Sequence, residues 1–273
     1  MTTTSTTVPS SNTATTGPDT AYTSDRHAAF DRVFNFRDLG GYLAEGGRTL
    51  RWGRLYRSDG LHAMTDHDVA TMTGLGLRTV IDLRTRVEAV ERGSFPVDRH
   101  PVDHHHLPLM RRTWEDDTQL VTPTEPALVA EFLTARYVEM LSEGGPSLAG
   151  VISLLARPRT YPAVFHCAVG KDRTGVVAAM VLDLLGVGHD LIVHDYTLSA
   201  LGMARIEEWL VANDPVEAAS WAQQPSAWLA SPPAAMAAFL ELLQAEHGGA
   251  AGYLTERGVP GTVIDAVRSN LLR

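Results

Sequence analysis

The residues best suited to chemistry are Cys167 and Arg173, which lie in the run His-Cys-Ala-Val-Gly-Lys-Asp-Arg-Thr-Gly at residues 166–175. Five residues separate the thiol from the guanidinium. A loop of this length can curl so that successive backbone N–H groups point at one centre and form a nest for an anion. A helix that starts in the loop directs its positive end to the same centre. The spacing therefore predicts a site that binds a phosphoryl group beside a thiol.

Several residues of this loop have an expected role in holding the phosphate. Arg173 can grip two phosphate oxygens with its planar fork, which a lysine cannot do. Gly170 permits a backbone turn that a Cβ atom would obstruct. The residues expected to surround the bound phosphate are Ala168, Val169, Gly170, Lys171, Asp172 and Arg173.

Cys167 is the expected nucleophile, because the positive field of the nest favours a thiolate. The thiolate would attack phosphorus and form a phosphocysteine intermediate. Thr174 is placed to hydrogen-bond the sulfur when it leaves, and His166 is expected to order the loop rather than act as a base. The competing interpretation is a small buried cysteine beside a core histidine. It does not explain why the only cysteine of the chain precedes an Arg-Thr-Gly run at the required spacing.

The overall composition excludes several classes of protein. Of the 273 residues, 44% are hydrophobic and 20% are charged, as in an ordinary globular protein, and the formal net charge of -9 argues against nucleic acid as a partner. A single cysteine excludes a disulfide within the chain, and no nucleotide-binding G-x-x-x-x-G-K-[ST] pattern is present. No run of 18 apolar residues exists, so no stable membrane insertion is expected. Without a conventional signal peptide the expected location is the cytoplasm, while export by another route stays open.

The elements that must position the loop alternate between strands and helices. Short β-branched runs at Thr79–Leu83 and Ala163–His166 predict buried strands. Thr65 is the predicted N-cap of a helix that reaches Leu75. Further helices are predicted over Glu125–Leu141, Pro146–Leu155 and Val176–Leu185. This alternation predicts an α/β fold whose mainly parallel central sheet is flanked by helices and presents its ligand site at the carboxyl ends of the strands.

The two ends of the chain differ from this pattern. Residues 1–24 contain 14 Ser or Thr residues, so residues 1–27 are predicted to be a disordered tail before a catalytic domain at residues 28–273. Residues 200–249 hold three tryptophans and many alanines, which predicts helices without strands. A helix, a stop at Gly258 and a last helix from Thr262 to Leu272 follow.

The loop also matches the H-C-x5-R-[ST] signature of protein tyrosine phosphatases. Three other segments extend the match, namely Asn35–Gly41, Arg57–Asp59 and Asp82–Thr85 with Glu88. From about residue 30 onward, the chain resembles the atypical bacterial tyrosine phosphatases of the mycobacterial tyrosine phosphatase B type. The resemblance implies a tyrosine phosphatase-like fold in which residues of about 200–245 form a helical lid. It also implies activity on phosphotyrosine, sometimes on phosphoserine or phosphothreonine, and on phosphoinositides.

The leaving group needs a proton, and one carboxyl group can supply it and later activate a water molecule. The resemblance places this acid inside the loop, at Asp172, and the alternative is a carboxylate that only stabilises the helix. Asp82 is the second candidate because it ends a strand at the same edge, although an ion pair with Arg84 or Arg57 is its expected role. Lys171 is expected at the rim, where its charge would suit a polyanionic head group.

No metal or other cofactor is expected. His104, His105 and His106 are adjacent, but consecutive side chains of an extended segment point to opposite faces, so we interpret them as a polar strand edge. The predicted function is hydrolysis of phosphate monoesters through phosphocysteine. A phosphotyrosine protein is the first expected substrate and partner, and a phosphoinositide is the alternative.

Two rival functions remain at this stage. A non-catalytic phosphate-binding module usually lacks the cysteine, the arginine or the acid, and all three are present here. A rhodanese-type sulfur transferase also uses a cysteine loop, but His166 and Thr174 fit phosphatases better.

Overall fold

The computed structural model describes residues 26–114 and 121–273. The predicted tail therefore lies almost entirely outside the described residues. Residues 26 and 27, the last two of the predicted tail, are described. Arg26 is 2% exposed and donates a hydrogen bond of 3.0 Å to the carbonyl oxygen of Asp38. The Arg26 guanidinium also lies 3.8 Å from the ring centroid of Tyr42. The packed domain thus includes Arg26 and begins before the predicted boundary at residue 28.

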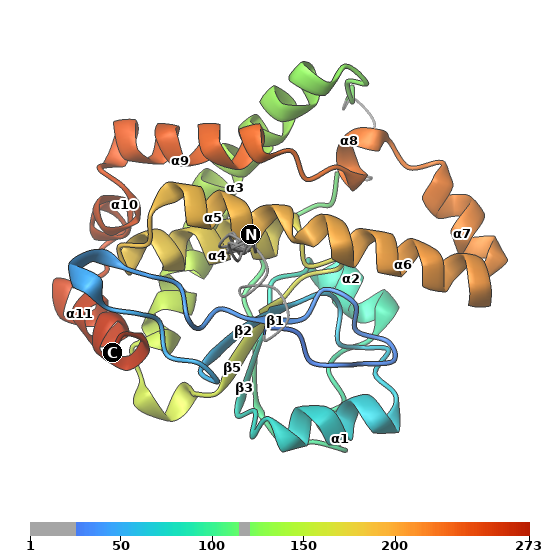
Figure 1. The fold of residues 1–273 in the computed structure, drawn as a ribbon, viewed down its shortest axis with the longest axis horizontal. Coiled ribbons are helices and arrows are strands. Elements are labelled where there is room, and N and C mark those ends of the chain that lie inside the picture. The colour runs from blue at the N-terminus through green and yellow to red at the C-terminus, as the bar shows by residue number, and fades with distance from the viewer. Residues whose placement is uncertain (1–25, 115–120) are drawn as a thin grey trace, which may run out of the picture.

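A five-stranded sheet lies at the centre of the molecule (Figure 1). In their order across the sheet, the strands are β1 (Arg37–Asp38), β2 (Leu55–Ser58), β5 (Ala163–His166), β3 (Thr79–Asp82) and β4 (Asp103–His106). β1 is antiparallel to β2, and the other four strands run parallel. His166 lies in register with Ser58 on one side and Asp82 on the other, so the chain leaves these three strands at one edge. The α/β prediction is confirmed, and the Cys167 loop begins at the edge expected for a ligand.

Helices cover both faces of the sheet. The principal ones are α1 (Asp66–Gly74), α3 (Pro126–Leu155) and α4 (Asp172–Leu184). Ile81 and Phe165 point into the larger core, which includes α3 and α4. Val80 and Val164, one residue earlier in each strand, point into a second core that includes α1. Both faces of these strands are buried, which explains their continuous apolar sequence.

The helix predicted to begin at Thr65 is confirmed as α1. The Thr65 hydroxyl accepts a hydrogen bond from the N–H of Asp68, whose carboxylate accepts one from the N–H of Thr65. A second capping box starts α2 (Arg86–Arg92), where Thr85 and Glu88 make the same exchange. Glu88 is thereby fixed in the first turn of α2.

One predicted break is absent, because α3 continues through Pro146. The sequence pattern predicted two helices, Glu125–Leu141 and Pro146–Leu155. Proline removes one backbone hydrogen bond and crowds the preceding turn. Both halves of α3 nevertheless bury apolar side chains in the same core. Packing along the whole length therefore outweighs the local proline signal.

The rest of the chain is mainly helical. The remaining α-helices are α5 (His189–Thr197), α6 (Ser199–Asn213), α7 (Pro215–Ala222), α8 (Ser226–Leu229), α9 (Pro233–His247), α10 (Ala250–Glu256) and α11 (Gly261–Leu271). Two short 3-10 helices cover Glu45–Gly47 and Pro158–Thr160. Residues 200–249 contain helices and no strand, as predicted. Within the described ranges, no helix is both long and apolar enough to cross a membrane.

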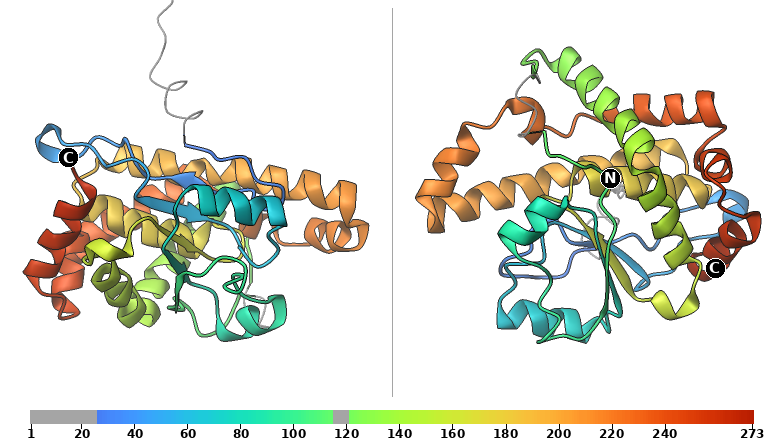
Figure 2. Two further views of the ribbon diagram at one scale, coloured as in Figure 1. Left: turned by 90° about the horizontal axis from the view of Figure 1, so that it is seen from below. Right: turned by 180° about the vertical axis from the view of Figure 1, so that it is seen from behind.

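The segment expected as a lid, residues of about 200–245, divides into two parts. α9 packs against α3 and α5 and buries Met236, Phe239 and Leu240 in the core. α6, α7 and α8 instead extend to one side of the molecule (Figure 2), and α7 has no buried residue. Only α6 to α8 are therefore candidates for a lid, and that role stays a prediction.

Candidate active site

Cys167 starts the loop that joins β5 to α4, and its side chain is 1% exposed. The backbone N–H of Gly170 donates a hydrogen bond of 3.3 Å to its Sγ atom. α4 begins at Asp172, so the positive end of this helix lies within the loop. Both features stabilise negative charge on the sulfur, which a thiolate nucleophile requires.

Gly170 lets the loop lie directly against the segment that follows β2. Its φ angle is +72°, and a Cβ atom would lie 2.6 Å from the carbonyl oxygen of Ser58. Only glycine accommodates both constraints. The N–H of Gly60 then donates a hydrogen bond of 2.9 Å to the carbonyl oxygen of Ala168. The loop therefore rests on the backbone of residues 58–60.

Two side chains brace the outside of the loop. Asn35 donates through Nδ2 to the carbonyl oxygen of Val169 at 2.9 Å, and Arg57 donates through Nη2 to that of Gly170 at 2.8 Å. In a planar trans peptide the N–H points opposite to the C=O. Holding these two carbonyl groups outward therefore turns the N–H groups of Gly170 and Lys171 inward. The N-terminal motifs thus support the geometry of the anion nest.

A buried carboxylate holds the arginine brace in place. Asp195 in α5 lies 3.0 Å from Arg37 and 2.5 Å from Arg57, and all three side chains are at most 1% exposed. Burial alone would raise the pKa of Asp195, but the two guanidinium groups hold it below its usual range. Burial lowers the pKa of Arg57 to about 10, so this side chain stays charged at neutral pH. Two cations against one anion leave net positive charge behind the loop, on the side of Cys167.

Asp59 fixes the position of the Asn35 brace. Its carboxylate accepts hydrogen bonds from the N–H groups of Phe34 and Asn35 and from the hydroxyl of Ser58. Burial raises the pKa of Asp59 to about 6. The Arg57–Asp59 motif therefore supports the loop in two ways. Arg57 binds the loop directly, and Asp59 holds Asn35, which binds it.

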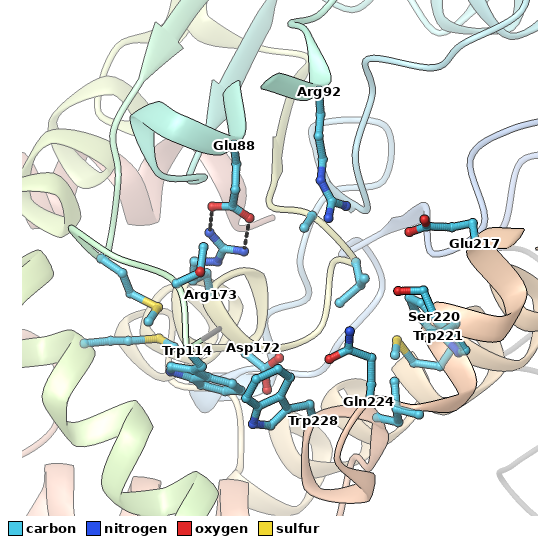
Figure 3. Close-up of a pocket in the computed structure, with 17 residues that line it drawn as sticks. Glu88, Arg92, Trp114, Asp172, Arg173, Glu217, Ser220, Trp221, Gln224 and Trp228 are labelled. Carbon is cyan, nitrogen blue, oxygen red and sulfur yellow. Dashed lines mark hydrogen bonds and ion pairs between the residues drawn. The ribbon is translucent and has the colours of Figure 1, made fainter. Parts of the chain in front are cut away.

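Arg173 forms a two-point ion pair with Glu88 of α2, which Figure 3 shows as two dashed lines. Its Nη1 and Nη2 atoms lie 2.5 and 2.8 Å from the two carboxylate oxygens. Burial would raise the pKa of Glu88, but the hydrogen bonds from Arg173 lower it to about 2. A guanidinium has five N–H donors, so the pairing fixes the plane of the fork and leaves three donors for a phosphate.

Asp172, the acid that the resemblance implies, lines the same pocket as Arg173. Its Oδ1 atom accepts hydrogen bonds of 2.7 Å from the Tyr137 hydroxyl and from the Lys171 ammonium. The carboxyl group is 13% exposed. Its position suits both predicted roles, helix stabilisation and proton transfer.

Asp82 occupies a different environment, with its side chain fully buried beside Arg84. Its carboxylate accepts from Nε of Arg84 at 3.0 Å and from Nη2 at 2.6 Å. Burial alone would raise the pKa of Asp82, but the hydrogen bonds from Arg84 bring it below its usual range. Asp82 therefore has the structural partner that the sequence suggested. Arg57, the other suggested partner, pairs with Asp195 instead.

The position of Lys171 corrects a prediction. Lys171 was expected at the pocket rim, but its side chain is 0% exposed. Its Nζ atom donates to Asp172 and also to the carbonyl oxygen of Ala230, each at 2.7 Å. A buried ammonium needs such partners, because leaving it unpaired costs several kcal/mol. The Lys171 ammonium is therefore hydrogen-bonded inside the protein. The backbone N–H of Lys171 is the part of this residue that faces the nest.

His166 and Thr174, the two remaining site residues predicted in this run, are both fully buried. Nδ1 of His166 hydrogen-bonds the carbonyl oxygen of Cys167 at 3.1 Å, and burial lowers the pKa of this histidine to about 4. A neutral imidazole that orders the loop fits this geometry. The Thr174 hydroxyl is buried and has no hydrogen-bond partner within the described part of the chain. Its donor is therefore uncommitted, as the predicted hydrogen bond to the sulfur requires.

The pocket above the loop has an apolar wall and a polar wall (Figure 3). Trp114 and Trp228 lie beside each other on the apolar wall, with ring centroids 6.3 Å apart. Arg92 and Glu217 lie on the polar side. Residues of α7 and α8 thus complete the pocket. Neither Trp114 nor Arg92 belongs to a sequence motif, so the sequence alone does not mark them as pocket residues.

The three consecutive histidines lie in β4, at the edge of the sheet. His106 hydrogen-bonds the carbonyl oxygen of Arg84 at 2.8 Å. In the two described ranges, the group of side chains close enough to share a metal ion is Asp31, His67 and Asp68. Asp68 already serves the capping box of α1, so this group has a structural explanation.

Comparison with known proteins supports the resemblance seen in the motifs. The model of the tyrosine phosphatase family matches residues 28–273. The triple specificity protein phosphatase PtpB of Mycobacterium tuberculosis is 30% identical over 275 residues, which cover 88% of this chain and 97% of that protein. A putative tyrosine-protein phosphatase of Cupriavidus necator is 32% identical over 200 residues, covering 72% of this chain and 71% of that protein.

Solved structures are more distant. TpbA of P. aeruginosa in complex with pTyr is 18% identical with a TM-score of 0.29, covering 55% of this chain and 71% of that one. The Siw14 catalytic core is 14% identical with a TM-score of 0.35, covering 74% and 97%. TM-scores this low do not identify a family. The family model, by contrast, matches nearly the whole described domain. The chain belongs to the tyrosine phosphatase family.

Proposed function

We propose that the chain hydrolyses phosphotyrosine in proteins, with Cys167 as the nucleophile. The observation that carries this proposal is the loop around the sulfur. The N–H of Gly170 points at Sγ, and the Arg173 fork is held in a fixed plane by Glu88. Electrostatic attraction links Cys167 to Arg173 and to Arg57. One arrangement thus binds a phosphate dianion and stabilises a thiolate.

In the first step the Cys167 thiolate attacks phosphorus, and an S–P bond forms while the P–O bond to tyrosine breaks. Arg173 and the inward N–H groups of the loop hold the phosphoryl oxygens as charge develops on them. Asp172 gives its proton to the departing phenolate oxygen. The products of this step are tyrosine and phosphocysteine.

In the second step a water molecule attacks phosphorus and the S–P bond breaks. Asp172, now a carboxylate, takes a proton from this water, which regenerates the acid for the next cycle. The Thr174 hydroxyl donates a hydrogen bond to the sulfur as negative charge returns to it. Inorganic phosphate then leaves, and the thiolate is restored.

The walls of the pocket favour an aromatic substrate over a polyanionic one. The indole rings of Trp114 and Trp228, tilted by 51° to one another, offer an aromatic wall beside Asp172, against which a tyrosine ring can pack. The charge of Lys171 is not available to an inositol head group. A relative named for triple specificity is the reason to test other phosphate esters as well.

The proposal is tested by phosphate release from a matched panel of substrates. The panel comprises a phosphotyrosine peptide, its phosphoserine and phosphothreonine counterparts, and a phosphoinositide in micelles. We expect the highest kcat/KM on the phosphotyrosine peptide, with no effect of a chelator. Cys167→Ser should lose turnover but still bind phosphate, because Arg173 and the backbone N–H groups remain.

Each other outcome contradicts a distinct part of the proposal. Near wild-type turnover by Cys167→Ser would refute the nucleophile. A higher kcat/KM on the phosphoinositide would replace the substrate, and loss on chelation that zinc or magnesium reverses would replace the mechanism. Binding of every ester without turnover would leave a phosphate-binding module.

The α6–α8 segment is proposed to act as a lid over this site. Trp221 and Trp228 of this segment line the pocket and are only half-buried. Few buried contacts fix α7, so its movement costs little compared with movement of α9. A lid of this kind would shield the thiolate and phosphocysteine from oxidants.

A further inference from the structure

Asp172 has an unusual set of partners, because both of its hydrogen bonds from side chains go to the same oxygen. Oδ1 accepts from the Tyr137 hydroxyl and from Nζ of Lys171, each at 2.7 Å. Both donor side chains are 0% exposed. Oδ2 has no hydrogen-bond partner among the residues that the structure describes, and Asp172 lines the pocket. One oxygen of the carboxyl group is therefore held and the other is left to the substrate.

The Tyr137 hydroxyl belongs to a directed chain of donors. It lies 2.7 Å from the hydroxyl of Tyr196 as well as 2.7 Å from Asp172. A carboxylate only accepts, so Tyr137 donates its single proton to Asp172 and accepts from Tyr196. Burial raises the pKa of Tyr137 well above its usual value, and that of Tyr196 likewise, so both phenols keep their protons. The hydrogen bonds therefore run in one direction, from Tyr196 to Tyr137 and from Tyr137 to the Asp172 carboxylate.

Lys171 ties the same oxygen to a distant part of the chain. It is the only lysine in the sequence. Its Nζ atom also donates to the carbonyl oxygen of Ala230, the residue that caps the C-terminal end of α8. Lys171 therefore couples the position of the Asp172 carboxyl group to the position of α8. A rim lysine that only attracts substrate would show neither burial nor these two bonds.

Two donors on Oδ1 have a consequence for proton transfer. When Asp172 carries a proton, that proton must sit on Oδ2, because Oδ1 already accepts two hydrogen bonds. Oδ2 is the oxygen that can reach a leaving group in the pocket. The donors also fix the rotation of the carboxyl group, and proton transfer requires a donor within about 2.6–3.2 Å of its acceptor.

We propose that Tyr137 and Lys171 are positioning residues that hold Asp172 through Oδ1 and so place the transferable proton on Oδ2. The inference rests on the proposed role of Asp172 as the acid. Neither side chain touches the phosphate in this scheme, since Nζ of Lys171 and the Tyr137 hydroxyl are both engaged with Asp172. Their loss should therefore slow the first chemical step only where the leaving group needs the proton.

The first experiment compares leaving groups in the full chain. We expect Tyr137→Phe and Lys171→Met to lower kcat/KM on phenyl phosphate by roughly 10- to 100-fold, since misplacing a reacting group costs about that much. On p-nitrophenyl phosphate, whose leaving group needs little protonation, the loss should be several-fold smaller. Tyr161→Phe is the matched control, because Tyr161 is also a buried tyrosine and donates only to the carbonyl oxygen of Leu155. It should leave the leaving-group dependence unchanged.

The comparison with Asp172→Asn separates this inference from the proposed function. If Asp172→Asn shows no leaving-group dependence, Asp172 is not the acid and the proposed mechanism fails. Asp172→Asn can instead show the leaving-group dependence while Tyr137→Phe and Lys171→Met lower kcat/KM equally on both esters, or not at all. In that case only the positioning role fails.

A second measurement needs no variant. Because Lys171 is the only lysine, an amine-reactive ester labels a single side chain, and mass spectrometry of its peptide gives the rate. We expect labelling at least about tenfold slower than that of an added lysine peptide, since the ammonium is buried and hydrogen-bonded. Labelling at the rate of the free peptide would overturn the tie to Asp172 and Ala230, even if Lys171→Met did not fold.

Discussion

Glu88 and Arg173 meet through two parallel N–H···O hydrogen bonds of 2.5 and 2.8 Å, although they are 85 residues apart in the sequence. The pair joins the first turn of α2 to the first turn of α4. Glu88 is fixed on its side by the capping box with Thr85. The cap of one helix therefore sets the orientation of the guanidinium that is proposed to bind phosphate.

Glu88→Gln tests this relationship. Glutamine can keep the capping box but not the ion pair, so we expect α2 to persist while Arg173 loses its fixed plane. The kcat/KM for the phosphotyrosine peptide should fall about tenfold, mainly through a higher KM, and phosphate should inhibit more weakly. Glu91→Gln, an exposed position on the same helix, is the control and should behave as wild type. Unchanged KM and phosphate inhibition in Glu88→Gln would show that Arg173 needs no such support.

Asp172 and Asp82 give a matched pair for finding the acid. Asp172→Asn should slow substrates with poor leaving groups by about 10²–10⁴-fold, because it removes the transferable proton. Asp82→Asn should act on stability instead, since it leaves the buried Arg84 charge uncompensated, at a cost of about 3–5 kcal/mol. Urea unfolding and kinetics per folded molecule separate the two effects. If Asp82→Asn is stable but inactive and Asp172→Asn is active, the acid has been misassigned.

The sheet edge and the reactive loop could be predicted because their signals are local. The strand Ala163–His166 and the helix after it follow from contiguous residues, and the signature itself spans ten positions. β1 has two residues and β2 has four, too few for a periodic pattern. The break expected at Pro146 was wrong because core packing along α3 is not visible in the local sequence.

The sequence motifs suggested that Arg37, Arg57 and Asp59 support the loop, but the partners of these supports could not be predicted because they are distant in sequence. Asp195 pairs with Arg37 and Arg57, which lie 158 and 138 residues away, and no motif marks it. The inward position of Lys171 depends on a carbonyl group 59 residues later. A sequence pattern identifies residues that share a loop, but only the fold shows which way each side chain points.

His166 should make stability depend on pH. Burial lowers its pKa to about 4, whereas an unfolded histidine titrates near about 6.5. As the pH falls from about 6.5 to about 4 the unfolded state binds the proton and the folded state does not, so the unfolding free energy decreases over this window, by roughly 3 kcal/mol at most. Asp59, whose pKa is raised to about 6, acts in the opposite direction between about 3.8 and 6.

A substitution isolates the histidine from that opposing group. His166→Asn keeps a donor for the Cys167 carbonyl oxygen but does not titrate. Urea unfolding between pH 4 and pH 7 should show a flatter acid limb in this variant than in wild type, because the Asp59 contribution is common to both. Parallel curves for the two proteins would mean that His166 is not held neutral by burial.

The last prediction concerns α7, the part of the proposed lid with the fewest ties to the core. Removing all of residues 204–245 would also remove α9, whose Met236 and Phe239 belong to the core, so the change must be smaller. Replacing residues 215–224 with a Gly/Ser linker of equal length removes the α7 wall of the pocket, including Trp221, and no buried residue of α7 is lost. We expect a folded phosphatase that peroxide inactivates faster than wild type, because the thiolate is no longer shielded. Bound phosphate should restore protection in both proteins, which serves as the control for reaction at Cys167. Equal inactivation rates with and without α7 would show that this helix shapes the pocket wall without acting as a lid.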